Sequence, residues 1–207
     1  RKPHGKRPPL EAEDALARRL NGVLGPVSDV VVLRARAAPT GFDARFSAVW
    51  RRYEYRVADR AALRDPLQRH RTAWVSADLD ARAMDVAAHG LLGLHDFASY
   101  CKAREGATTI RTLLDFSWRR DDDGVLVGEV VADAFCHSMV RALVGACVEV
   151  GEGSLTPGDL VELRDARERT SAFKVMPARG LTLMEVGYPD DAELALRAEQ
   201  TRGLRTL

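Results

Sequence analysis

The segment 132–151, ADAFCHSMVRALVGACVEVG, constrains the fold of this chain more than any other. Its apolar residues recur at i, i+3, i+4, i+7 and i+8, which is the spacing of one buried face of a helix. These residues are Val140, Leu143, Val144, Cys147 and Val148. The segment therefore predicts a helix that packs against a core along one side.

A second face of the same predicted helix carries His137, Arg141 and Gly145. An arginine is not deprotonated in a protein, so a guanidinium beside a core needs an anion or must extend to water. Two interpretations of Arg141 therefore stay open. It either pairs with a carboxylate or phosphate, or it is a solvated surface residue.

The composition limits the class of protein. With 207 residues and 46% hydrophobic residues, the chain can bury a core as one large or two small domains. The sequence contains neither an apolar run long enough to span a membrane nor a signal peptide, so we expect a cytoplasmic protein with no membrane association. Cys101, Cys136 and Cys147 lack C-x-x-C spacing and are predicted to be reduced thiols.

Several enzyme classes lack support in the sequence. We find no nucleophile-elbow, zinc-protease, phosphate-binding or dinucleotide-binding motif. The five histidines are scattered, without metal-ligand spacing. We therefore expect no metal and no cofactor.

Positive charge is concentrated locally although the net charge is only +1. Residues 45–71 hold eight arginines against three acidic residues, a bias that suits a polyanion. The predicted loop 95–111 interleaves Phe97 and Tyr100 with Lys102, Arg104 and Arg111, which suits base stacking and phosphate contact. A solvated arginine-rich surface and a loop anchored by its aromatic residues explain these patterns as well.

The remaining patterns predict an α+β fold. Besides the central helix, helices are expected over about 10–25, from Asp80 to Gly93, and over 156–167. Strands are expected at 30–33, 49–57, 72–75, 114–118, 125–131 and 180–188, with Leu114, Phe116 and Trp118 on one face. This order gives an antiparallel-rich sheet with helices on one face. We expect domain limits of 1–37, 38–189 and 190–207, the last part being a short helix or a disordered tail without chemistry.

Four blocks resemble, in their order and separation, blocks of the tRNA pseudouridine synthase A family. They are GFDARFSAVWRRYEY (41–55), LLGLHDFASY (91–100), ADAFCHSMVRALVGACVEVG (132–151) and PARGLTLMEVGYP (177–189). The resemblance implies two similar subdomains whose sheets join, with the catalytic cleft between them and the first subdomain incomplete here. It also implies a cofactor-free isomerase, usually a homodimer, that converts uridine to pseudouridine at positions 38–40 of the tRNA anticodon stem-loop.

The resemblance assigns roles to two residues. Tyr53, the first tyrosine of RRYEY, resembles the family tyrosine that contacts the target base and handles a proton. Arg141, in the H-x-M-V-R pattern, resembles the arginine that pairs with the nucleophilic aspartate. We expect Arg141 at an open cleft edge near Tyr53, without an acidic partner from this chain.

The nucleophilic aspartate itself has no match. Its R-T-D-A-G-V-H-A type motif is absent; Asp43 belongs to the F-D-A-R block, and Asp133 stands where many family members have asparagine. We therefore expect a fragment that is inactive alone, with residues 1–37 as a remnant of the N-terminal domain. A degenerate natural paralogue is the alternative.

The predicted RNA contacts are Arg45, Arg51, Arg52, Lys102, Arg104, Arg111 and His137. For His137, a cap of local structure is the alternative, because a lone histidine on a helix is more often structural. Two other function classes remain open at this point. One is a non-catalytic RNA-binding module that uses the same cations on phosphates, and the other is an α+β domain whose arginines are merely solvated.

Overall fold

The computed structural model describes residues 12–102, 104 and 106–202. Its contacts divide the chain into two compact units, Arg1–Phe42 and Asp43–Leu207. Each unit is described separately below. The three-part division at 37 and 189 remains a prediction.

The first unit contains helix α1 (Ala12–Leu24), as its apolar periodicity predicts. The predicted strand at 30–33 is wrong, because these residues pair with no strand in the described part of the chain. Both the N–H and the C=O of Val32 are instead bonded to the side-chain amide of Asn21, at 2.7 Å each. That local pairing occupies backbone groups that a sheet would use. Val31 and Leu33 are exposed.

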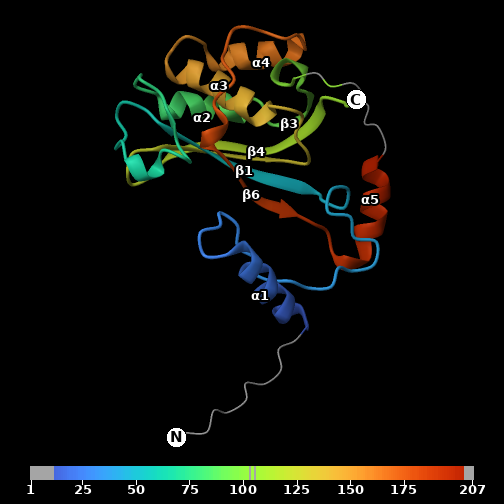
Figure 1. Cartoon of the computed structure of the whole chain (residues 1–207). Helices are drawn as coiled ribbons and strands as arrows, with labels where there is room; N and C mark the ends of the chain where they lie inside the picture. The colour runs from blue at the N-terminus through green and yellow to red at the C-terminus, as the bar shows by residue number, and fades with distance from the viewer. Residues whose placement is uncertain (1–11, 103, 105, 203–207) are drawn as a thin grey trace, which may run out of the picture. The chain divides into compact units, whose positions relative to one another are not determined.

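The second unit is built on a six-stranded sheet (Figure 1). The strands are β1 (Trp50–Ala58), β2 (Ala73–Trp74), β3 (Gly93–Asp96), β4 (Ile110–Arg120), β5 (Leu126–Ala132) and β6 (Leu181–Gly187). Their order is β2-β1-β5-β4-β3, and β6 also pairs with β1. Only the short β1–β2 pairing is parallel. The predicted antiparallel-rich sheet is therefore confirmed.

Figure 1 shows three helices together on one side of this sheet, α2 (Ala81–His89), α3 (Met139–Gly151) and α4 (Pro157–Ala166). Asp80 caps α2 by accepting from two backbone N–H groups, and Thr156 caps α4 in a reciprocal capping box with Asp159. The predicted end of α2 at Gly93 is wrong, because the helix stops at His89. Gly93 has φ +108°, a left-handed conformation that directs the chain into β3.

The prediction of one continuous loop at 95–111 is also wrong. His95 and Asp96 pair with Arg111 and Ile110 as the end of the β3–β4 ladder. Strand β3 has the sequence GLHD, which is too short and too polar to show the alternation of apolar and polar residues that predicts a strand. Within the rest of this span, the turn Ala98–Tyr100 forms a short 3-10 helix that buries Tyr100.

In strand β4, the prediction that Leu114 shares a face with Phe116 and Trp118 is wrong. The register between β4 and β5 shifts between Leu113 and Asp115, which places a bulge at Leu114. Leu113, Phe116 and Trp118 are consequently buried, whereas Leu114 is 50% exposed. The alternation that placed Leu114 with Phe116 and Trp118 holds only where the ladder is uninterrupted.

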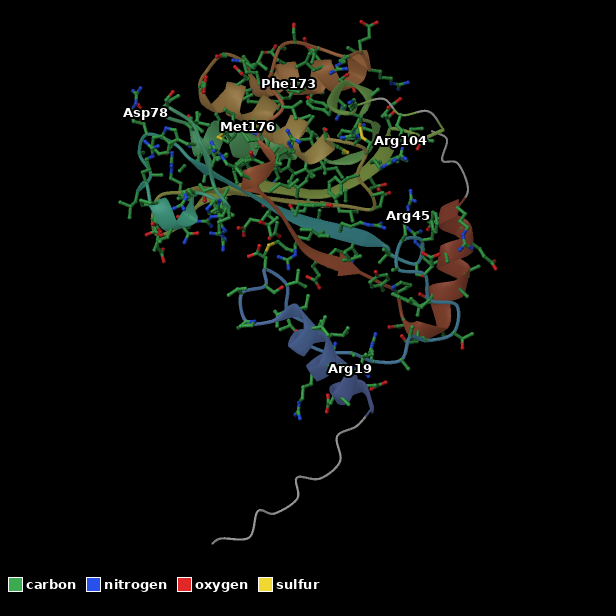
Figure 2. The ribbon with its side chains drawn as sticks, in the orientation of Figure 1. Arg19, Arg45, Asp78, Arg104, Phe173 and Met176 are labelled. Atoms are coloured by element: carbon green, nitrogen blue, oxygen red, sulfur yellow. A yellow bond between two sulfur atoms is a disulfide. The ribbon has the colours of Figure 1, made fainter. Side chains whose placement is uncertain are left out.

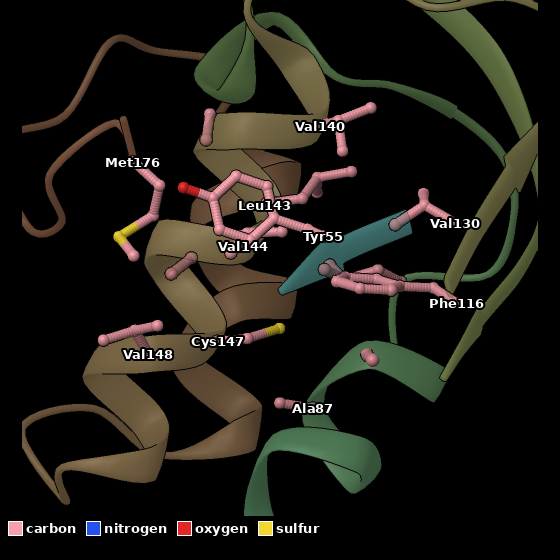
Figure 3. Packing of buried hydrophobic residues seen from close by; sticks show 14 of the residues in the cluster. Tyr55, Ala87, Phe116, Val130, Val140, Leu143, Val144, Cys147, Val148 and Met176 are labelled. Carbon is pink, nitrogen blue, oxygen red and sulfur yellow. The ribbon is translucent and has the colours of Figure 1, made fainter. Parts of the chain in front are cut away.

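The apolar face of α3 packs on the sheet as predicted (Figure 3). Leu143, Val144 and Cys147 lie against Tyr55 and Phe116 in the close-up, all fully buried. Each of the buried leucine, valine and phenylalanine side chains contributes about 1.5–3 kcal/mol by leaving water. The central helix of the sequence is therefore the central helix of the fold.

The opposite side of α3 touches a connecting segment so closely that only glycine fits. A Cβ on Gly145 would lie 1.9 Å from the backbone oxygen of Lys174. We call residues 174–177 the strap. The strap crosses α3 at Gly145 and brings Met176 beside the helix (Figure 3).

The prediction that all three cysteines are reduced thiols is wrong for two of them. Cys101 and Cys136 form a disulfide with 5.8 Å between their Cα atoms, a separation that suits such a bond. Sequence spacing gave no sign of it because the two residues lie 35 positions apart and meet only in the fold. Cys147 is free, and burial raises its pKa to about 12.

The last residues of the described chain form helix α5 (Leu194–Arg202), which resolves the choice between a helix and a disordered tail. Leu194 and Ala198 are buried, and the hydroxyl of Ser47 donates to the carbonyl of Leu194 at 3.0 Å. Figure 1 shows α5 apart from the three-helix layer. Among the described residues, no helix is both long enough and apolar enough to cross a membrane.

Candidate active site

Strand β1 presents the two tyrosines of RRYEY to the helix-covered face. Tyr55 is fully buried, and its hydroxyl donates to the carbonyl of Pro177 at 2.6 Å. Burial raises the pKa of Tyr55 to about 12, although the positive charges of Arg141 and Arg179 act against that rise. Tyr55 therefore holds the strap rather than exchanging a proton near neutral pH.

Tyr53 lies on the same face two residues earlier and is only partly buried. Its ring meets the ring of Phe135 edge to face, with 5.1 Å between the centroids. Phe135 belongs to the turn before α3, so the two blocks that carry Tyr53 and Arg141 are in contact. In the sheet, Tyr53 stands opposite Val130 of β5 and Leu183 of β6.

Arg141 lies in the first turn of α3 and is held by the strap. Its Nε donates to the carbonyl of Met176, and its own carbonyl accepts from the backbone N–H of Met176 at 3.1 Å. Its side chain is partly buried, and its charge acts on the hydroxyl of Tyr55. Within the residues that the structure describes, Arg141 forms no ion pair with a carboxylate.

The two aspartates considered from the sequence both have local structural contacts. Asp43 accepts from the backbone N–H groups of Arg45 and Phe46, at 2.8 and 2.9 Å, and pairs with Arg202. These hydrogen bonds hold the pKa of the Asp43 carboxyl below its usual value. Asp133 Oδ1 accepts from the backbone N–H of Thr112 at 3.1 Å.

Three of the predicted RNA-contacting arginines come together at one cavity. Arg45, Arg51 and Arg111 line a cavity of about 520 Å³, and Phe135 lines it too. Since the Phe135 ring also touches Tyr53, this arginine cavity adjoins the face that carries the candidate target-base tyrosine. Figure 2 shows Arg45 next to α5, which lines the same cavity.

Arg52 lies elsewhere. Alternation along β1 places it on the sheet face opposite Tyr53, where it pairs with Glu129 at 3.2 Å and Glu185 at 2.8 Å. The hydrogen bonds that Arg52 donates to the Glu185 and Glu129 carboxylates raise the pKa of Arg52. The structure thus separates Arg52 from Arg51, the other predicted RNA contact of β1.

Lys102, Arg104 and His137 are exposed and do not line the arginine cavity. The prediction that His137 lies on the helix with Arg141 is wrong, because α3 begins at Met139 after Ser138 with φ 67°. The carbonyl of His137 accepts from the backbone N–H of Lys102 at 2.9 Å. In the described part of the chain, no group of three or more potential metal ligands occurs.

Sequence reasoning missed two arginines of the arginine cavity, Arg197 and Arg202 of α5. They lie outside every recognised block, and the helix that carries them shows little amphipathic pattern. Arg197 and Arg202 join Arg45 and Arg51 only because α5 folds back onto the segment that precedes β1.

Comparison with known proteins shows the family of this chain. A family model described as tRNA pseudouridine synthase matches residues 87–189. A protein of Leifsonia xyli subsp. xyli named tRNA pseudouridine synthase A is 82% identical over 207 residues, which cover all of this chain and 72% of that relative. A relative of the same name from Streptomyces griseus subsp. griseus is 53% identical over 198 residues, 95% of this chain and 69% of the relative. The chain therefore belongs to the tRNA pseudouridine synthase family.

Proposed function

We propose that this chain forms the larger part of an enzyme that isomerises uridine to pseudouridine at positions 38–40 of the tRNA anticodon stem-loop. The observation that carries the proposal is Arg141, a partly buried guanidinium fixed by Met176, with no carboxylate ion pair among the described residues. The family's aspartate motif would supply that carboxylate. The assignment of the role to that motif is supported by the contacts of Asp43 and Asp133, since the first carboxylate accepts from the backbone of its own turn and the second from the backbone N–H of Thr112.

The proposed chemistry gives each residue one task. The aspartate carboxylate attacks the nucleoside and the N-glycosidic bond breaks. The base rotates, and C5 bonds to the ribose in place of the ring nitrogen while the bond to the aspartate breaks and frees the carboxylate. C5 then loses its proton and the freed ring nitrogen gains one, so the product is an isomer of the substrate. Arg141 keeps the aspartate ionised and aligned, because a charge-assisted arginine–carboxylate bond favours the charged form. Tyr53 stacks on or hydrogen-bonds the target base and handles the proton.

The first experiment measures tritium release from tRNA labelled at C5 of uridine. We expect no release above background from these 207 residues alone, because they lack the nucleophile's motif. A longer protein that includes the motif should release tritium. Turnover by the 207-residue chain would show that a residue within it is the nucleophile and would contradict the assignment of Arg141.

Replacing Tyr53 by phenylalanine in the longer protein tests its role at the base. The hydroxyl is lost while the ring contact with Phe135 is kept. Because general acid–base catalysis contributes typically 10²–10⁴-fold, we expect kcat to fall by about 10²-fold or more with little change in tRNA affinity. Equal losses in kcat and in affinity, measured by tritium release and filter binding, would count against this role.

The same proposal includes a homodimer located in the cytoplasm that uses no cofactor. Family membership supports the tRNA substrate, and sedimentation of the longer protein at several concentrations would test the dimer. A non-catalytic RNA-binding module would bind tRNA in the filter-binding measurement but would release no tritium from labelled tRNA.

A further inference from the structure

Helix α5 places two arginines at the arginine cavity although its sequence shows no RNA-binding motif. We propose that Arg197 and Arg202 complete a phosphate-binding pocket, which holds the RNA backbone next to the target nucleotide. The inference rests on the proposed function and deepens it, because it assigns part of substrate recognition to the C-terminal helix.

The charge at the cavity is strongly unbalanced. Among the described residues that line it are five arginines and one carboxylate, Asp133, which already accepts from the backbone of Thr112. Arginine presents several N–H donors in a plane and binds phosphate oxygens in pairs. The volume of about 520 Å³ is within the range of small-ligand sites. The five arginines are Arg45, Arg51, Arg111, Arg197 and Arg202.

Arg51 and Arg197 show the imbalance most directly. Burial lowers the pKa of Arg51, and repulsion from the positive charge of Arg197 lowers it further. Tyr188, Tyr53 and Asp133 act in the opposite direction and offset part of this shift. Arg51 donates to two neutral acceptors, the carbonyl of Asp133 at 2.7 Å and the carbonyl of Arg45 at 2.8 Å. The Nε of Arg197 is buried, and within the described residues it has no hydrogen-bond partner. A phosphate between these groups would offset the repulsion.

Phe46 positions two further cations. The guanidinium carbons of Arg45 and Arg202 each lie 5.1 Å from the centroid of its ring, within cation–π range. Asp43 pairs with Arg202 at 3.2 Å and also fixes the turn that carries Arg45. These contacts hold the arginines in place before a ligand arrives, which reduces the entropy lost on binding.

The location favours RNA over other anions. Phe135 lines the arginine cavity and touches the ring of Tyr53, so a phosphate in the cavity would be close to a base held at Tyr53. A nucleic acid supplies both groups in one chain. Phosphate contacts of this kind position the substrate without reading its sequence.

The test compares Arg197→Gln, Arg202→Gln and the matched control Arg82→Gln, each in the longer protein. Arg82 is an exposed arginine of α2 that does not line the cavity, so its replacement removes the same charge elsewhere. Affinity for an anticodon stem-loop RNA is measured between 50 and 200 mM salt. Each lost phosphate contact should reduce the slope of log K against log salt by about 0.7–0.9, and KM in tritium release should rise.

The possible outcomes separate the two proposals. A reduced slope for both cavity variants and an unchanged slope for Arg82→Gln would support the phosphate pocket. Slopes equal to that of Arg82→Gln, with tritium release intact, would overturn the pocket and leave the proposed function standing. Absence of RNA binding and of tritium release in the unmodified longer protein would overturn both. Thermal unfolding of each variant identifies any loss of RNA affinity that is caused by misfolding. If Arg197→Gln misfolds, the result for Arg202→Gln, at the exposed end of α5, decides between the outcomes.

Discussion

Replacing Arg141 by glutamine in the protein that carries the aspartate motif should lower kcat by roughly 10²–10³-fold. The guanidinium is fixed by the Met176 carbonyl, so glutamine removes the charge that favours the ionised aspartate. Because the loss of a cation raises the pKa of a neighbouring carboxyl, the acidic limb of the pH–rate profile should move to higher pH. The measurement is tritium release across the pH range.

Arg141→Lys is the informative companion variant. Lysine keeps the positive charge but lacks the planar set of donors. Compared with Arg141→Gln, it should therefore bring the acidic limb of the pH–rate profile closer to that of the unmodified protein than it brings kcat. A glutamine variant with an unchanged pH profile would show that Arg141 acts through the strap alone. In that case the contact with Met176, rather than a carboxylate, would explain the loss of activity.

Replacing Gly145 by alanine should destabilise the fold by about 1–3 kcal/mol. The added methyl group would lie 1.9 Å from the backbone oxygen of Lys174, and backbone cannot rotate away as a flexible side chain can. The strap would have to move from α3, which would weaken the contacts that Met176 makes with Arg141. Urea unfolding of the chain measures the change in stability, and activity of the longer protein should fall with it.

Gly158→Ala provides the matched control. Gly158 lies in α4, and a Cβ there would meet only the hydroxyl of Thr156, at 3.7 Å. Because alanine favours helix more than glycine does, this variant should be as stable as the unmodified chain or up to about 1 kcal/mol more stable. Equal effects at Gly145 and Gly158 would contradict the close crossing of the strap.

The sequence alone determined the features that depend on local order. The period of Val140, Leu143 and Val144 gave α3, and the alternation of Tyr53 with Tyr55 gave the buried face of β1, because side-chain direction follows directly from backbone geometry. The caps at Asp80 and Thr156 were predictable for the same reason, since each bonds its own helix. The family resemblance rested on blocks with fixed local patterns.

Only the tertiary structure decided which distant residues meet. The bulge at Leu114, the Cys101–Cys136 disulfide and the crossing of the strap over Gly145 all depend on pairings between separate segments, which no local period records. The arginine cavity shows this most clearly. Arg45 and Arg51 were visible in the sequence as a basic run, but Arg197 joins them from about 150 positions away. A cluster of like charges becomes a binding site only when the fold fixes its members around one cavity, and that arrangement comes from packing rather than from the order of residues.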